Sequence, residues 1–191
     1  MIFTELSHPH VTFIVGLPGS GKSYLLNYLK ENPFIKPAIY DDWLITYKND
    51  CGDKNFNCDS RYPELVSNLN NNIPCIISSI KFVKSKFLNG SVSTLVNEIN
   101  NLKTECIYFD NDPESCKFNV KSRDIKLGGH WKPNDEGIYW YYGTIYNNKP
   151  LYKSELSIIE DLSSTYEIPT GYTSIKIKRD KNIKKLPFGY E

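Results

Sequence analysis

The sequence has no apolar run that approaches the roughly 20 residues a membrane-spanning helix needs. Its first ten residues, MIFTELSHPH, lack the basic and apolar regions of a signal peptide. The formal net charge is only +1, so no overall field draws the chain to nucleic acid or to a membrane, and such a contact needs a local patch. We therefore expect a cytoplasmic protein with no membrane partner.

Cysteine and histidine are scarce, and neither has the spacing of a metal site. The five cysteines form an odd set without a C-x-x-C pair. They are Cys51, Cys58, Cys75, Cys106 and Cys116. The three histidines, His8, His10 and His130, are scattered, and we expect the first two to lie in a lead-in before the first strand. Reduced thiols, with Cys75 and Cys106 inside strands, are expected rather than a zinc site.

A glycine-rich loop of fixed spacing does lie near the start of the chain. The segment GLPGSGKS, residues 16–23, matches the P-loop pattern G-x-x-x-x-G-K-[ST]. Residues 11–15 predict a short buried strand before it, and a helix begins near Gly21. Gly19 and Gly21 can adopt backbone angles that other residues avoid, so the loop N–H groups can turn inward toward an anion. The positive end of the helix favours the same ligand.

The side chains of this loop predict a nucleotide and its metal ion. Lys22 can reach the β- and γ-phosphates, and the Ser23 hydroxyl can ligate Mg²⁺, so ATP and Mg²⁺ are the expected cofactors. The expected nucleotide-binding residues are Gly16, Pro18, Gly19, Ser20, Gly21, Lys22, Ser23 and Tyr24. The alternative is a strand-to-helix turn without a ligand.

Strand and helix patterns alternate along the rest of the chain. The expected strands are 11–15, 37–41, 74–79, 104–109 and 173–178, and the expected helices are 22–31, 61–71, 91–102, 113–124 and 154–166. Ser60, either Ser91 or Ser93, and Asp112 are the expected helix caps. This alternation favours one α/β domain over residues 1–191, with a parallel sheet between helices and ligands at the carboxyl ends of the strands. Residues 125–153, rich in Gly, Trp and Tyr, are a lid, an insertion, a hairpin or plain surface structure.

The ends of the second and third strands carry the next candidates. Asp41 and Asp42 follow PAIY; we expect Asp41 to accept a proton from an acceptor hydroxyl, or to orient it, and Asp42 to cap a helix opened by DDWLITYK. The alternative is that capping is the only role of the pair. The third strand, CIISSI, ends in Ser78 and Ser79 where motor ATPases and GTPases place an Asp, which disfavours both classes.

Basic residues follow the fourth strand. Lys117, Lys121 and Arg123 lie at the entrance to the aromatic-rich segment, where a cation can cover a transferring phosphate. Arg123 is the candidate catalytic residue, and a solvated basic helix face is the alternative.

Together these segments resemble the P-loop kinases of the polynucleotide kinase and zeta-toxin type. The resemblance is carried by GLPGSGKS at 16–23, YDD at 40–42, CIYFDNDPESCKFNVKSRD at 106–124 and SSTYEIP at 163–169. It implies a P-loop NTPase three-layer sandwich with strand order 2-3-1-4-5, binding ATP and Mg²⁺. It also implies that Asp41 acts on the acceptor hydroxyl, that Lys22 and Ser23 take their P-loop roles, and that Arg123 belongs to a lid.

The chain departs from that family at three places. Leu44 stands where the family often has Arg, Ser79 stands near an expected Asp, and Phe118-Asn119 replaces an Arg-Asn pair. Other phosphate anchors are available. They are Lys81, Lys84 and Lys86, and in the tail Lys176, Lys178, Arg179, Lys181, Lys184 and Lys185. The aromatic residues that can stack on bases are Phe82, Phe87, Trp131, Tyr139, Trp140, Tyr141 and Tyr142.

The sequence thus predicts an ATP-dependent phosphotransferase that acts on a hydroxyl of a polynucleotide, at a terminus or on a modified base. A kinase of a small nucleotide or nucleotide sugar is one alternative. A nucleotide-binding regulatory or interaction module that turns over slowly, if at all, is another; the missing strand-three Asp favours it, and Asp41 with Arg123 opposes it.

Overall fold

The structure is a computed structural model that describes residues 8–31, 36–43, 59–126, 139–146 and 149–179. Within these ranges, only the backbone is described for residues 123–126, 139–146 and 149–155. Among the described residues, no helix combines the length and the apolar character needed to cross a membrane.

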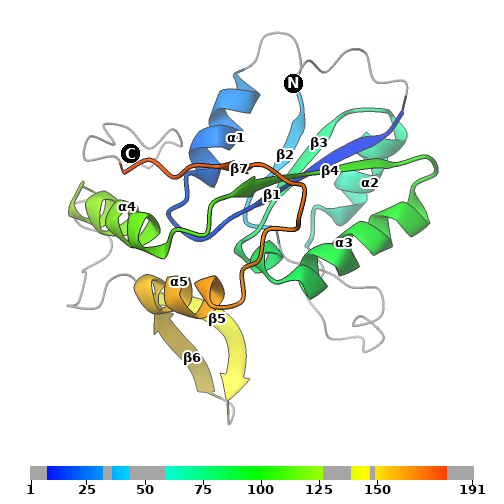
Figure 1. The fold of residues 1–191 in the computed structure, drawn as a ribbon. Helices are drawn as coiled ribbons and strands as arrows, with labels where there is room; N and C mark the ends of the chain where they lie inside the picture. Colours follow the sequence, from blue (N-terminus) through cyan, green and yellow to red (C-terminus); the bar gives the residue numbers. More distant parts are fainter. Residues whose placement is uncertain (1–7, 32–35, 44–58, 127–138, 147–148, 180–191) are drawn as a thin grey trace.

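A five-stranded, all-parallel sheet forms the centre of the molecule (Figure 1). Its strands are β1 (His10–Val15), β2 (Ala38–Tyr40), β3 (Cys75–Ser78), β4 (Lys103–Phe109) and β7 (Ser174–Ile175). They lie in the order β2-β3-β1-β4-β7, which confirms the predicted parallel sheet with order 2-3-1-4-5. β1 is central: Val11 lies beside Cys75 of β3 on one side and Thr104 of β4 on the other.

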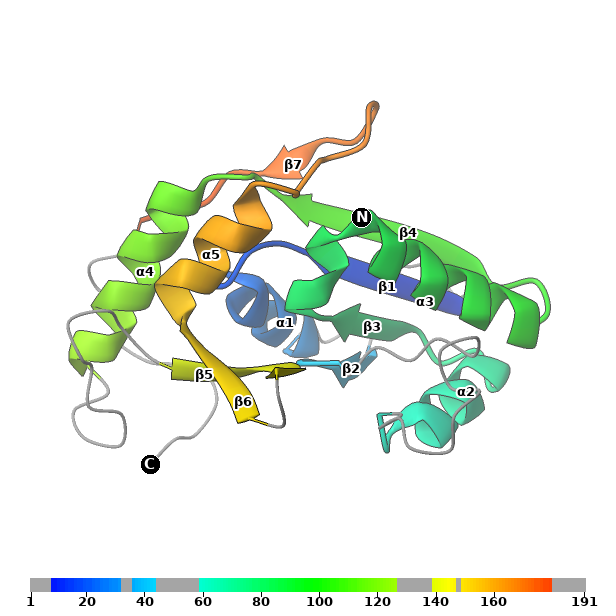
Figure 2. The same cartoon turned by 90° about the horizontal axis from the view of Figure 1, so that it is seen from below.

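Helices cover both faces of this sheet. They are α1 (Lys22–Lys30), α2 (Tyr62–Asn70), α3 (Ser85–Glu98), α4 (Pro113–Lys126) and α5 (Glu155–Ser163), with a short 3₁₀ helix η1 (Ile80–Val83) before α3. Along β1, Phe13 and Val15 pack in the larger core with residues of α2, α3 and α5, whereas Ile14 faces Leu26 of α1. Figure 1 shows α1 above the sheet and α3 and α5 below it, and Figure 2 views the sheet from the side of α3 and α5.

One predicted helix start and one predicted helix cap are wrong. α3 begins at Ser85, and Ser91 lies inside it, where its hydroxyl donates to the Phe87 carbonyl at 2.9 Å. Serine can bond back to the carbonyl one turn earlier, so a serine alone does not mark a helix start. α2 is preceded by Arg61 rather than by Ser60 as its cap. The Asp112 cap is confirmed, because its carboxylate accepts the Ser115 N–H at 3.0 Å.

The segment after α4 contains a separate antiparallel pair, β5 (Tyr139–Tyr146) and β6 (Lys149–Ser154). Tyr139 lies opposite Ser154, and β6 runs directly into α5. The backbones of residues 139–146 and 149–154 therefore pair as antiparallel strands, as the expected hairpin alternative requires, and a role as a lid stays a prediction.

The position of His10 differs from the prediction, whereas the positions of Cys75 and Cys106 agree with it. His10 belongs to β1 rather than to a lead-in; it is buried, and its ring lies 3.5 Å from the Glu105 carboxylate. Cys75 is buried in β3 and Cys106 half-buried in β4, as predicted, and both are reduced. Burial raises the pKa of the Cys75 thiol to about 12, so this thiol stays protonated and unreactive.

Candidate functional site

The loop between β1 and α1 needs two of its glycines for their shape. Gly19 and Gly21 have φ of 77° and 103°, in the left-handed region that side chains disfavour. A Cβ on Gly19 would lie 2.5 Å from the Cys116 carbonyl oxygen, so α4 closes the loop from outside. The close approach of α4 and the two left-handed residues together fix the curl of the loop.

This loop leaves the start of α1 open to an anion. Gly21 is the N-cap, no side chain caps the first turn, and the first turn holds no acidic residue. The Ser20 hydroxyl is buried and has no hydrogen-bond partner among the described residues. The N–H groups of a helix's first turn have no partner inside the helix, and together with the helix dipole they bind anions. The loop therefore has the donors that a phosphate group requires.

Lys22 crosses the inside of the loop. Its side chain is only 9% exposed, and Nζ donates to the carbonyl oxygens of Gly16 and Leu17, both at 2.9 Å. This holds a positive charge beside the first turn of α1. Of the remaining predicted loop residues, Pro18 is buried in the loop, whereas the Tyr24 side chain is 75% exposed on α1.

Asp41 at the end of β2 faces the loop across the sheet edge. The Ser23 hydroxyl donates to Asp41 Oδ2 at 3.2 Å, and Asp41 Oδ1 accepts the Asp42 N–H at 3.0 Å. The Asp42 side chain is exposed, and its backbone has φ of 50°. Of the two aspartates, Asp41 is thus the one beside the loop. The helix that Asp42 was expected to cap lies outside the described residues.

The Ser23 hydroxyl is suited to a magnesium ion, because Mg²⁺ prefers oxygen ligands. Asp41 Oδ2 lies 3.2 Å from Ser23 Oγ, where it can accept a hydrogen bond from a hydroxyl next to that ion. Within the described ranges no three His, Cys, Asp or Glu side chains cluster as metal ligands. The rest of such a shell would be phosphate and water, which is the usual environment of Mg²⁺.

The end of β3 supplies hydroxyls in buried positions. Ser78 is fully buried, its hydroxyl has no hydrogen-bond partner in the described part of the chain, and its carbonyl accepts the Trp43 N–H at 2.9 Å. Ser79 starts η1, and its hydroxyl accepts the Lys81 N–H at 3.4 Å. Through these bonds the two serines fix the backbone at the end of β3 and at the start of η1. Neither serine supplies the negative charge of an Asp.

Two side chains to which the sequence analysis gave no role in the loop hold the loop in place. Asn119 of α4 donates through Nδ2 to the Gly19 carbonyl at 3.0 Å and to the Lys178 carbonyl at 2.9 Å. The Tyr166 hydroxyl lies 2.5 Å from the Phe109 carbonyl and 3.3 Å from the Val15 carbonyl, so it joins the ends of β4 and β1. Both residues lie inside the quoted segments 106–124 and 163–169, but their sequence neighbours do not reveal these distant partners.

The cations of α4 divide into different roles. Lys117 pairs with Glu114 at 3.0 Å and with Glu160 of α5 at 2.9 Å, and the Glu160 and Glu114 hydrogen bonds raise its pKa. It therefore ties α4 to α5 rather than facing the loop. Lys121 is exposed. Arg123 lies within α4, but its side chain is outside the described part of the chain, so its catalytic role stays a prediction.

The expected nucleic-acid contacts are described only in part. Phe82 is wrong as a stacking residue, because it is 1% exposed and packs edge-to-face on Phe13 with ring centroids 5.4 Å apart. Phe87 is half-buried, with Lys86 Nζ 4.9 Å from its ring centre. In the tail, the exposed basic residues are Lys176, Lys178 and Arg179. The other expected tail lysines, Trp131, and the side chains of 139–142 lie outside the described residues.

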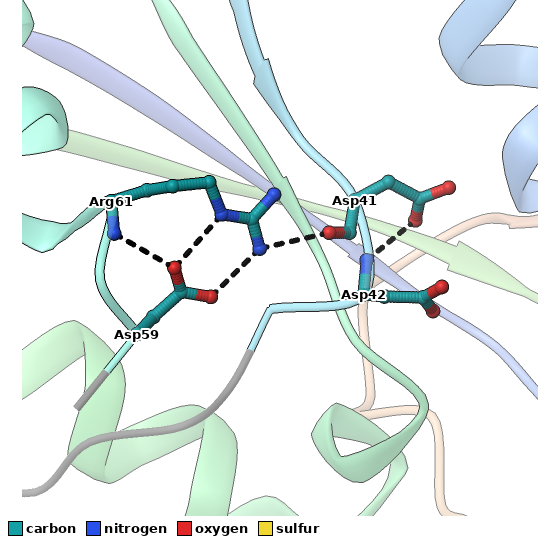
Figure 3. Close-up of polar contacts among 4 residues, drawn as sticks. All are labelled: Asp41, Asp42, Asp59 and Arg61. Carbon is teal, nitrogen blue, oxygen red and sulfur yellow. Dashed lines mark hydrogen bonds and ion pairs between the residues drawn. The ribbon is translucent and has the colours of Figure 1, made fainter. Parts of the chain in front are cut away.

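A further group that sequence reasoning missed adjoins Asp41 (Figure 3). Arg61, just before α2, donates from Nη2 to the Asp41 backbone carbonyl at 3.1 Å. Its guanidinium also forms two bonds with Asp59, from Nε to Oδ1 at 2.8 Å and from Nη2 to Oδ2 at 2.7 Å. Twenty residues separate Arg61 from Asp41, so no short-range pattern links them.

Comparison with known proteins identifies no relative. No family model matches the chain, no curated protein is significantly similar to it, and no solved structure matches it.

Proposed function

We propose that this chain is a P-loop kinase, an ATP-dependent phosphotransferase whose acceptor is a hydroxyl group of a polynucleotide. The observation that carries the proposal is the contact between Ser23 and Asp41. It brings together the loop hydroxyl suited to a nucleotide-bound Mg²⁺ and a carboxylate suited to an acceptor hydroxyl. The parallel sheet with order 2-3-1-4-5 is compatible with a P-loop NTPase fold.

In this mechanism the loop binds the phosphates of ATP. The N–H groups at the start of α1 and the Lys22 ammonium stabilise the negative charge that spreads over the transferring phosphoryl group. Lys22 would exchange its bonds to the Gly16 and Leu17 carbonyls for phosphate oxygens. Mg²⁺, held by Ser23, would neutralise charge on the β- and γ-phosphates.

Asp41 acts on the acceptor. Its carboxylate accepts the acceptor O–H proton as the acceptor oxygen forms a bond to the γ-phosphorus and the bond from that phosphorus to the ADP oxygen breaks. The products are a phosphorylated acceptor, ADP and a protonated Asp41, which returns its proton to water. Arg123, on the last turns of α4, is the proposed lid cation over the transferring phosphate.

Basic residues favour a polynucleotide over a small acceptor. Lys81 and Lys84 lie around η1, just past the end of β3, and Lys86 follows in the first turn of α3. Exposed Lys176, Lys178 and Arg179 extend the positive charge after β7. Replacing Lys81, Lys84 and Lys86 together by Gln should weaken single-strand binding for all base sequences and flatten its salt dependence. Binding to single strands that is unchanged between low and moderate salt would favour a small acceptor.

Two rival functions predict different results for phosphate transfer and for oligonucleotide binding. A kinase of a small nucleotide or nucleotide sugar would transfer phosphate but show no salt slope with oligonucleotides. A regulatory module would bind ATP without transfer, and the serines in place of an Asp at the end of β3 favour that reading.

The deciding experiment incubates the protein with γ-labelled ATP and Mg²⁺ against oligonucleotides, nucleosides, nucleotides and sugars. We expect label on an oligonucleotide hydroxyl, and a loss on the order of 10²-fold or more in a folded Lys22→Ala variant. ATP binding without transfer to any acceptor would support the regulatory module. Wild-type turnover in folded Lys22→Ala would overturn the P-loop mechanism.

A further inference from the structure

The turn that carries Asp41 contains a left-handed residue. Asp42 has φ of 50°, a conformation that is uncommon for residues with a side chain and that aspartate adopts more readily than most. The chain bends directly after β2, and the Asp41 carboxylate accepts the Ser23 hydroxyl there. Whatever holds this turn therefore also sets the position of the proposed base.

Hydrogen bonds hold the turn within itself and on both of its sides. Asp41 Oδ1 accepts the Asp42 N–H within the turn itself. After the turn, the Trp43 N–H donates to the Ser78 carbonyl, which anchors the chain to the end of β3. Before it, the Asp41 carbonyl accepts from Nη2 of Arg61, the residue just before α2, at 3.1 Å (Figure 3).

Arg61 is itself held rigidly. Its fork of Nε and Nη2 meets both oxygens of Asp59, and this two-point geometry fixes the plane of the guanidinium. The Asp59 hydrogen bonds raise the pKa of Arg61 above its ordinary value, and an arginine guanidinium is in any case charged in proteins. The guanidinium also lies over the rings of Trp43 and Tyr40, with its central carbon 5.4 and 5.9 Å from their centres.

Asp59 is the fixed end of this chain of contacts. Its side chain is 3% exposed, and Oδ1 also accepts the Arg61 backbone N–H at 3.0 Å. An ion pair of this kind, with Asp59 buried and Arg61 38% exposed, adds little net stability, because the loss of hydration offsets the attraction of the two charges. Its clear effect is geometric: it fixes the direction in which Arg61 donates to the end of β2.

We propose that Asp59 and Arg61 are positioning residues for Asp41: the pair locks the turn after β2 and thereby holds the Asp41 carboxylate against Ser23. This inference rests on the proposed function, in which Asp41 acts on the acceptor. Neither residue touches the reacting atoms in this role, and both act through the Asp41 backbone.

The test is a double-mutant cycle that combines substitutions of Arg61 with Asp41→Asn. Arg61→Met keeps an apolar side chain over Trp43 but removes the donor, whereas Arg61→Lys keeps the charge but cannot make the two-point contact with Asp59. We expect either variant, or Asp59→Asn, to lower kcat on the order of ten- to 10²-fold while the affinity for ATP stays near wild type. The matched control is Lys103→Met, at an exposed lysine that begins β4 and so lies at the amino ends of the strands, away from Asp41. It should leave kcat and the affinity for ATP unchanged.

In an Asp41→Asn background the same Arg61→Met substitution should cause no further loss of kcat, because there is no base left to position. An equal loss in both backgrounds would mean a merely structural role and would overturn the proposal while leaving the kinase function standing. A second readout does not depend on turnover: the Asp41 carboxyl ¹³C resonance, identified by its loss in Asp41→Asn. It should move in Arg61→Met and Asp59→Asn but not in Lys103→Met. An unmoved resonance overturns the positioning role even if no acceptor is phosphorylated.

Discussion

Asn119 Nδ2 donates to the carbonyl of Gly19, a residue 100 positions earlier, and to the carbonyl of Lys178 in the segment after β7. One amide group of α4 thus joins the P-loop to the last described segment of the chain, and Figure 1 shows these segments side by side. The glycines of the loop determine its shape, and the Asn119 side chain of α4 fixes its position.

Asn119→Ala should therefore affect both stability and nucleotide binding. The residue is 8% exposed, so the substitution leaves two carbonyl groups without their donor and should lower the free energy of unfolding by about 1–3 kcal/mol. The affinity for ATP should fall as well, since the loop loses its outer support. Denaturant unfolding and ATP titration measure the two effects.

Asn111→Ala is the matched control. Asn111 also donates to two carbonyls, those of Ser163 and Tyr166, but it is exposed and water can replace the amide. It should lose less stability than Asn119→Ala and keep wild-type affinity for ATP. Equal effects of the two substitutions on ATP affinity would show that Asn119 has no specific link to the loop.

Gly19→Ala should be much more damaging than Gly171→Ala. Both residues have positive φ, 77° and 93°, so each variant pays a conformational cost of about 1–2 kcal/mol. Only at Gly19 would the new Cβ meet the Cys116 carbonyl, whereas nothing lies within 4 Å of a Cβ at Gly171. Thermal or denaturant unfolding should rank wild type, Gly171→Ala and Gly19→Ala in decreasing stability. Similar stability of the two variants would mean that α4 does not close on the loop.

At Asp42, a change to glycine is predicted to maintain or raise stability rather than to lower it. Because its φ is 50°, Asp42→Gly removes a conformational cost and should leave the protein as stable or stabilise it by up to about 1 kcal/mol. Asp42→Val, with a branched side chain, should destabilise it instead. Greater stability of the Val variant in denaturant unfolding would contradict the left-handed turn.

Much of the fold was predictable, because its signals are local. Buried runs such as residues 11–15 and the fixed spacing of 16–23 define strand, loop and helix without outside help. The start of α3 was not, since Ser91 fits a cap or a helix interior equally well until its partner Phe87 is known. Whether Phe82 lies in the core or at the surface could not be predicted either, because an aromatic residue among lysines occurs in both places.

The candidate site divides in the same way. Lys22, Ser23 and Asp41 follow from motif and strand ends, and the structure brings them to one edge of the sheet. Arg61 could not be predicted, since its role depends on tertiary contacts across twenty residues.

Acid should weaken the protein partly through Asp112. Hydrogen bonds from the Ser115 hydroxyl and N–H, with the charge of Arg179 nearby, lower the pKa of this carboxyl below its ordinary 3.8. A lowered pKa in the folded state gives stability that is present above pH 3.8 and lost as pH falls through the folded-state pKa. Asp112→Asn can still cap α4 but cannot titrate. Its free energy of unfolding should thus fall less steeply than that of wild type below about pH 4, as measured by urea unfolding; an identical slope would contradict the shift.

The most direct test of the central claim compares Asp41→Asn with wild type in kcat and in ATP affinity, with the phosphorylated acceptor found in the panel. Since Asp41 acts on the acceptor proton and not on the nucleotide phosphates, kcat should fall on the order of 10²-fold or more while ATP affinity changes little. Wild-type kcat in a folded Asp41→Asn protein would contradict the claim, because the contact between Asp41 and Ser23 would then have no part in phosphate transfer.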